Sequence, residues 1–148
     1  MASEKLYRNT LKKNLATNAF LYKIGVVSYP ECSFCEKEKE SLEQIFIQCN
    51  YTEKVWAEVI KWLSSLNVNI NSLDNKEILI GIPNCEDELF VNHVLLIAKQ
   101  YLYFCCCRKM FPIFKVFMSR LRKIQNLELI ISKSKNKLSP YTAKWGNF

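Results

Sequence analysis

Three cysteines in the first third of the chain have the spacing of a metal site. Cys32 and Cys35 are separated by two residues, and Cys49 follows after thirteen more. A Cys-x2-Cys turn can bring two thiolates to one tetrahedral Zn²⁺, and a following helix can supply further ligands. Histidine at position 44 would complete a Cys-x2-Cys-x8-His-x4-Cys knuckle, but this residue is Gln44. The spacing therefore predicts three metal ligands and leaves the fourth position in doubt.

Each of these residues also has an explanation without a metal. A neutral amide oxygen is a poor zinc ligand, and Ser41 and Gln44 have the spacing of a capping box at the start of a helix. Free cysteines are commonly small buried apolar residues. The odd count of seven Cys, with no apolar leader after Met1, favours reduced thiols over a disulfide framework. We therefore expect an intracellular protein of the nucleus or cytoplasm.

Further short motifs lie around these cysteines in a characteristic order. They are Ser28–Cys35, Leu42–Cys49 and Val55–Trp56, with Lys23–Gly25 before them and Asn92–Tyr103 and Lys144–Gly146 after them. In order and spacing they resemble the zinc-binding region that follows the reverse transcriptase domain in LINE-type non-LTR retrotransposons. The resemblance runs from about residue 18 to the end of the chain.

This resemblance implies a function and a set of metal ligands. It implies a C-terminal accessory segment that binds element RNA or target DNA for an upstream reverse transcriptase. It also implies zinc as a cofactor, with ligands at Cys32, Cys35, position 44 and Cys49. Because Gln44 stands where the family has histidine, the family's ligand set carries over only to the three cysteines.

Positive charge is concentrated in the last third of the chain. Residues 1–98 hold 10 Lys/Arg and 13 Asp/Glu, and residues 99–148 hold 11 Lys/Arg and one Glu, so net charges of −3 and +10 sum to +7. A cationic block of this kind attracts polyanions, although a basic face kept for solubility has the same composition. We predict phosphate contacts without base reading. The predicted contact residues are Arg108, Lys109, Lys115, Arg120, Arg122, Lys123, Lys133, Lys135 and Lys137.

The elements that must position these residues are mostly helical. Apolar periodicity predicts an amphipathic helix over 53–66 with Thr52 as its N-cap. A long helix is predicted from Glu86 to about Lys109. Another is predicted over 112–132, with Pro112 at its first position. Two short helices are predicted within 4–26, the second ended by Gly25. A polar, Lys-rich linker is predicted over 132–139, where Lys133, Lys135 and Lys137 form a flexible arm.

The sequence thus predicts a mostly all-α fold, a small multi-helix domain with a Cys-x2-Cys knuckle. We expect a single domain over 1–148, with a knuckle element and amphipathic helix in 20–66, two long basic helices in 86–132, and a basic tail with docking aromatic residues in 133–148. The short apolar run at 78–82 lacks a decisive period, so it is predicted as an extended segment, either a buried strand or a connector.

Several classes of function are disfavoured. The chain has two Asp and one His, whereas two-metal nucleotidyl chemistry needs several convergent carboxylates. We therefore expect no enzyme and no small-molecule substrate.

The apolar segment Leu89–Cys107 contains Lys99, which costs roughly 2.5–3.5 kcal/mol at the centre of a membrane span. We therefore expect a buried central helix and no membrane partner. A helical protein-interaction module and a decayed element remnant remain as alternatives.

Overall fold

The computed structural model describes residues 15–68, 70, 73–83, 87–146 and 148. Over these ranges the chain is helical and has no β-strand, and one isolated antiparallel bridge joins Glu31 to Lys39. The helices in chain order are α2 (Asn18–Lys23), the π-helix η1 (Gln44–Gln48), α3 (Asn50–Ser65), α4 (Asn75–Ile80), α5 (Glu88–Cys107), α6 (Phe114–Ser134) and α7 (Leu138–Trp145). The predicted mostly all-α class is confirmed.

Helix α3 has the apolar face that its sequence predicts, but it begins earlier. Val59 and Leu63 on this face are fully buried. The helix starts at Asn50, so the prediction of Thr52 as N-cap is wrong. The Thr52 hydroxyl instead donates to the carbonyl of Ile45 at 2.8 Å, which ties α3 to η1.

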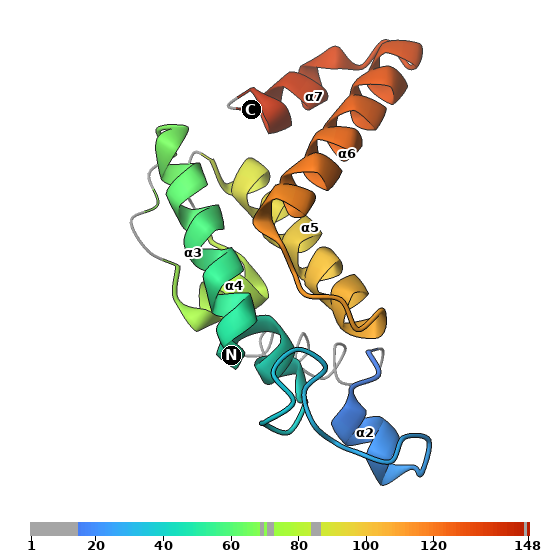
Figure 1. Cartoon of the computed structure of the whole chain (residues 1–148). Coiled ribbons are helices and arrows are strands. Elements are labelled where there is room, and N and C mark those ends of the chain that lie inside the picture. The colour runs from blue at the N-terminus through green and yellow to red at the C-terminus, as the bar shows by residue number, and fades with distance from the viewer. Residues whose placement is uncertain (1–14, 69, 71–72, 84–86, 147) are drawn as a thin grey trace.

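Helix α5 runs through the centre of the core (Figure 1). Val91, Val94, Ala98 and Leu102 are fully buried along its length, and it packs against η1, α6 and α7. By length and composition alone it could cross a membrane, and 56% of its most apolar window is buried inside the protein. Within the described ranges no other helix meets these two criteria.

The apolar run predicted as extended over 78–82 is largely helical. Asp74 accepts from the Glu77 N–H at 2.7 Å, and the Glu77 carboxylate accepts from the Asp74 N–H at 2.8 Å. This capping box starts α4, whose Ile78 and Leu79 are buried. The extended part is confined to the residues after α4. The sequence signal for the helix was the Asp-x-x-Glu spacing, which precedes the apolar run.

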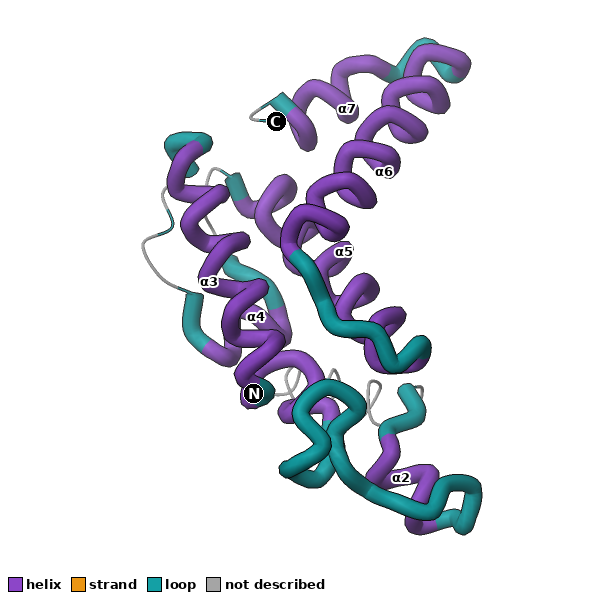
Figure 2. Tube along the Cα trace, in the orientation of Figure 1, coloured by secondary structure: helices purple, strands orange, loops and turns teal. Residues whose placement is uncertain are grey.

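The linker expected at 132–139 is a tight turn between two helices (Figure 2). Helix α6 begins at Phe114 with Ile113 as its N-cap, so the prediction of Pro112 as its first residue is wrong. It continues to Ser134, and α7 starts at Leu138. The turn is closed by Asn136, whose φ is +51°. The three lysines predicted to lie in a flexible arm therefore lie at the end of α6 and in this turn.

The terminal aromatic residues dock on the body of the protein. Trp145 is 2% exposed and packs edge-on against Phe90 of α5. Its indole N–H donates to Glu128 at 2.7 Å, and Lys144 pairs with the same carboxylate at 2.6 Å. The Nε2 atom of His93 on α5 also lies 3.2 Å from the Oε1 atom of Glu128. This single carboxylate thus joins α5, α6 and α7.

Helix α2 precedes the knuckle and has clear end signals. The Thr17 hydroxyl accepts from the Phe20 N–H at its start. Gly25, with a φ of +75°, follows its end as the sequence predicts. Most of the other short helix expected within 4–26, and Glu86 at the predicted start of the long helix, lie outside the described residues.

Candidate metal centre

The three predicted cysteine ligands come together in the structure. The sulfur atoms of Cys32, Cys35 and Cys49 all lie within 4.8 Å of one another. Three sulfurs bound at about 2.3 Å to one tetrahedral Zn²⁺ would lie about 3.8 Å apart. Cys32 and Cys49 are each 1% exposed, and Cys35 is half-buried. Both the donor type and the spacing fit zinc.

A closed loop positions the first two cysteines. The N–H of Glu40 donates to the carbonyl of Pro30 at 2.8 Å, and the N–H of Cys32 donates to the carbonyl of Glu38 at 2.7 Å. These bonds pair the two arms of the loop, and the turn between them carries Cys35. The predicted knuckle-like turn is therefore a hydrogen-bonded loop over residues 30–40, here called the knuckle loop.

The π-helix η1 positions the third cysteine together with Gln44. The Gln44 N–H donates to the Ser41 hydroxyl at 3.0 Å, which is half of the predicted capping box. The Cys49 N–H donates to the carbonyl of Gln44 at 3.0 Å, an i→i+5 bond that brings these two residues onto one turn. The Gln44 amide nitrogen then lies 3.6 Å from the sulfur of Cys35.

Glu40 contributes to the site, and sequence reasoning missed it. Its side chain is 1% exposed, and its two carboxylate oxygens accept from the Ser33 N–H at 2.6 Å and the Asn18 N–H at 2.7 Å. Ser33 lies between the two cysteines of the loop, so this carboxylate fixes the loop to the start of α2. Nothing in the sequence separates Glu40 from its exposed neighbours Glu36 and Glu38.

The three thiols differ in how readily they ionise. Burial raises the pKa of Cys49 to about 12 and also raises the pKa of Cys32. Burial acts in the same direction on Cys35, but the backbone N–H groups of Glu38 and Lys37 outweigh it and hold its pKa below the ordinary value. Of the three thiols, Cys35 therefore ionises most readily, and the thiolate is the form that binds a metal.

Two of the three cysteines at the end of α5 belong to the core, and none of the three belongs to the metal-type cluster. Cys105 and Cys106 are buried and Cys107 is exposed, as three successive helical positions predict. Burial raises the pKa of Cys106 to about 12, and the nearby carboxylate of Glu40 adds to the effect. Cys106 thus marks the contact between α5 and the knuckle loop.

The cations predicted to contact phosphate lie on three consecutive parts of the chain. All are exposed except Arg120, which is half-buried. Those at the end of α5 and just after it are Arg108 and Lys109, those on α6 are Lys115, Arg120, Arg122, Lys123 and Lys133, and those in the turn before α7 are Lys135 and Lys137.

Comparison with known proteins supports the zinc assignment. Residues 4–56 match the family model described as zinc-binding in reverse transcriptase, and this segment contains all three clustered cysteines. Among curated proteins and solved structures, none matches the chain. The resemblance found in the sequence is thus confirmed for this segment. Residues 4–56 are thus similar to the zinc-binding region associated with reverse transcriptases, and zinc is the metal that fits the three clustered cysteines.

Proposed function

We propose that this protein is a non-catalytic accessory domain that binds RNA or single-stranded DNA, without sequence preference, next to a reverse transcriptase. In this proposal zinc stabilises the knuckle loop, and the cations of α5, α6 and the following turn contact phosphates. The observation that carries the proposal is the positive charge on these three consecutive parts of the chain, which forms no ion pair with a carboxylate among the described residues.

The charge balance of this surface supports binding to a polyanion. Glu128 is the one acid in residues 99–148, and it is engaged by Lys144 and Trp145. Within the described residues, none of the nine predicted contact residues forms an ion pair with a carboxylate. Their charge is therefore available to phosphates, and each phosphate contact releases condensed counterions.

Two of the predicted cations, Arg108 and Arg120, lie close together where the end of α5 meets α6. The guanidinium carbon of Arg120 lies 4.4 Å from the centre of the Phe104 ring, and that of Arg108 lies 5.6 Å from it. One aromatic ring thus holds two cations, one from α6 and one from the residue after α5, which supports a local concentration of positive charge on the side of α6 that faces α5.

The spacing of the cations along α6 suits a nucleic-acid strand. Lys115, Arg122 and Lys133 are separated by seven and eleven residues, close to two and three helical turns, so they share one face of α6. Lys115 and Lys133 are about 27 Å apart along the helix axis at 1.5 Å per residue. This row is long enough to contact several phosphates.

A binding titration of the full chain tests the proposal. A fluorescently labelled single-stranded RNA of mixed sequence is titrated with protein at several salt concentrations, and anisotropy is measured. The variant Lys115→Gln/Arg122→Gln/Lys133→Gln should bind more weakly, and the slope of log affinity against log salt should fall by about 2, or roughly 0.7 for each lost contact.

A matched variant controls for the loss of charge. Lys23, Lys54 and Lys61 are exposed on α2 and α3, and their triple change to Gln removes the same net charge from elsewhere. Its salt slope should stay close to that of the parent. An absence of binding at low salt, or equal losses in both triple variants, would contradict the proposal.

A second candidate function is protein interaction, favoured by exposed aliphatic residues on the distal half of α6. Leu127, Ile130 and Ile131 are 59%, 63% and 50% exposed. In this reading the face binds the reverse transcriptase domain that precedes such regions. Leu127→Ser/Ile130→Ser should then reduce co-purification with such a domain while leaving the RNA affinity unchanged, and unaltered co-purification would exclude this face.

A further inference from the structure

Three side-chain donors converge at a site where tetrahedral zinc takes four ligands. Within the described part of the chain, the metal-type cluster contains Cys32, Cys35 and Cys49 and no fourth Cys, His, Asp or Glu. His93 is the one histidine of the chain, and it lies beside Glu128 and Trp145 on α5. The donor set is therefore one ligand short.

Gln44 occupies the fourth position with the wrong kind of atom facing the cluster. Its amide nitrogen, not its oxygen, lies 3.6 Å from the sulfur of Cys35. An amide N–H is a hydrogen-bond donor and offers no lone pair to a metal. The residue is 4% exposed, and both its backbone N–H and its carbonyl are bonded, to Ser41 and Cys49. Gln44 is thus held beside the cluster, and in this orientation its amide N–H stabilises the thiolate of Cys35 from outside the coordination shell.

We propose that the three-cysteine site keeps its fourth coordination position open, and that an external thiol or imidazole donor binds there. Gln44 then acts as a positioning residue for Cys35 and not as a ligand. Sulfur and imidazole donors are the external ligands expected, because zinc prefers them to neutral oxygen donors. The proposal concerns the metal site alone and does not depend on nucleic-acid binding.

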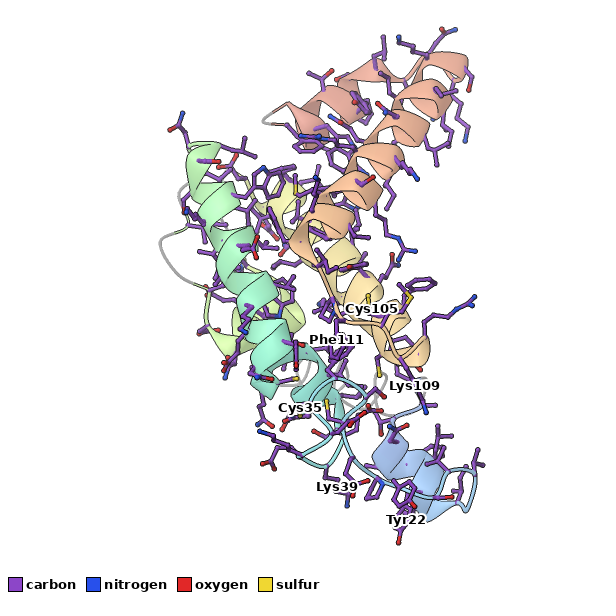
Figure 3. All side chains as sticks on the ribbon, viewed as in Figure 1. Tyr22, Cys35, Lys39, Cys105, Lys109 and Phe111 are labelled. Atoms are coloured by element: carbon purple, nitrogen blue, oxygen red, sulfur yellow. The ribbon has the colours of Figure 1, made fainter. Side chains whose placement is uncertain are left out.

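The exposure of the three cysteines indicates from which side an external donor can reach the metal site. Cys32 and Cys49 are closed off from solvent at 1% exposure, whereas Cys35 is half-buried. The residues that follow it, 36–39, are exposed, and so is Ser41. In Figure 3, Cys35 lies between the start of α3 and the part of the knuckle loop that carries Lys39. An external donor would therefore reach the site from the Cys35 side.

Cobalt substitution gives a direct test on the full chain. The protein is loaded with Co²⁺, and its visible absorption is recorded while imidazole, or in a second series 2-mercaptoethanol, is added without nucleic acid. The parent protein should show a saturable shift of the cobalt bands with one added ligand per site. Gln44→His supplies an internal imidazole and should bind Co²⁺ without any further shift.

Two more variants separate the sources of a fourth ligand. Gln44→Ala should still respond to imidazole, with a Co²⁺ affinity about tenfold lower because the hydrogen bond to Cys35 is lost. Cys85 lies outside the described residues, and Cys85→Ser should respond as the parent does. Circular dichroism establishes that each variant is folded, and if Gln44→His does not fold, the other three proteins still decide the question.

The opposite results would overturn the proposal. An absence of any shift in the parent would mean that the protein itself fills the fourth position. A shift that appears only in Cys85→Ser would identify Cys85 as the ligand, and one that appears only in Gln44→Ala would identify the Gln44 oxygen. Failure of the parent to bind Co²⁺ would exclude the site altogether.

Discussion

At the scale of single residues, Glu40 is the polar group on which the metal site most depends. A buried carboxylate is costly unless its oxygens are hydrogen-bonded, and each Glu40 oxygen accepts a backbone N–H, from Ser33 or Asn18. The amide of Asn18 also donates to the carbonyl of Glu31 at 2.8 Å, so the same residue joins both arms of the knuckle loop. These hydrogen bonds hold the loop through groups other than the three thiols.

Replacing Glu40 with Gln should weaken both the fold and the metal site. One carboxylate oxygen becomes an amide NH₂ that faces a backbone N–H, which leaves two buried donors opposed. We expect a loss of roughly 1–3 kcal/mol in the free energy of unfolding and a zinc affinity about 10–100-fold lower. Denaturant unfolding and chelator competition measure the two effects. Glu38→Gln, on an exposed side chain of the same loop, is the control, and equal behaviour of the two variants would contradict this role.

The cysteine pKa values predict how zinc affinity depends on pH. In the metal-free protein the pKa of Cys49 is about 12 and that of Cys32 is raised, both through burial. These thiols are therefore protonated near pH 7, and zinc must displace their protons to bind. The apparent zinc affinity should rise with pH, by about tenfold per pH unit for each proton released. Competition with a chelator at pH 6, 7 and 8 measures this, and an affinity that is constant over this range would show that the ligands are already ionised.

At the scale of elements, Lys99 joins α5 to the end of α4. Its ammonium group donates to the carbonyl of Leu79 at 2.8 Å, and burial lowers its pKa to about 8. Leu79 is in the last turn of α4, where carbonyl groups lack helical partners. The contact thus gives the Leu79 carbonyl a hydrogen-bond donor, but it keeps the Lys99 ammonium group partly out of water.

This contact predicts that the difference in unfolding free energy between the parent and a Lys99→Met variant depends on pH. Between pH 8 and 10.5 the unfolded chain binds more protons at Lys99 than the folded chain does, so this residue makes the free energy of unfolding rise with pH. Lys99→Met removes the effect. The stability of the parent relative to this variant should therefore be greater at pH 9.5 than at pH 7.5 in denaturant unfolding. Lys61→Met on the exposed face of α3 should show no such change, and a difference that does not vary with pH would contradict the lowered pKa.

At the scale of the whole molecule, the metal site and the helices share one core. Cys32, Phe34 and Cys49 belong to the same buried cluster as Trp56 of α3 and Leu102 of α5. The indole N–H of Trp56 also donates to the carbonyl of Phe46 in η1 at 2.7 Å. The knuckle is therefore part of the cooperative unit and not an appended module.

Removal of zinc should consequently destabilise the entire domain. The zinc-loaded chain should melt in one transition, and a chelator or the change Cys49→Ser should lower its midpoint without splitting it, because metal binding is coupled to folding. Calorimetry with elemental analysis measures both the transition and the zinc content. Cys107→Ser, at an exposed position outside the cluster, should match the parent. A separate early transition would contradict the shared core, and a broad one would indicate a decayed remnant without a specific core.

The sequence by itself determined the features that depend on local spacing. The period of α3 set its buried face, Gly25 marked the end of α2, and the separation of the three cysteines predicted their cluster. The apolar period alone predicted the wrong conformation for the short run that forms α4, because the signal for this helix is the capping box that precedes the run. Local signals suffice where backbone hydrogen bonds and side-chain periodicity decide the conformation.

The tertiary structure alone decided which polar groups are buried and which atoms they face. Glu40 is held by Asn18 at a separation of 22 residues, and Lys99 by Leu79 at 20. The approach of the Gln44 amide to Cys35 likewise depends on the knuckle loop folding back onto η1. Such groups look no different in sequence from exposed neighbours of the same type. Their burial and charge state depend on partners that only the folded chain brings within hydrogen-bonding distance.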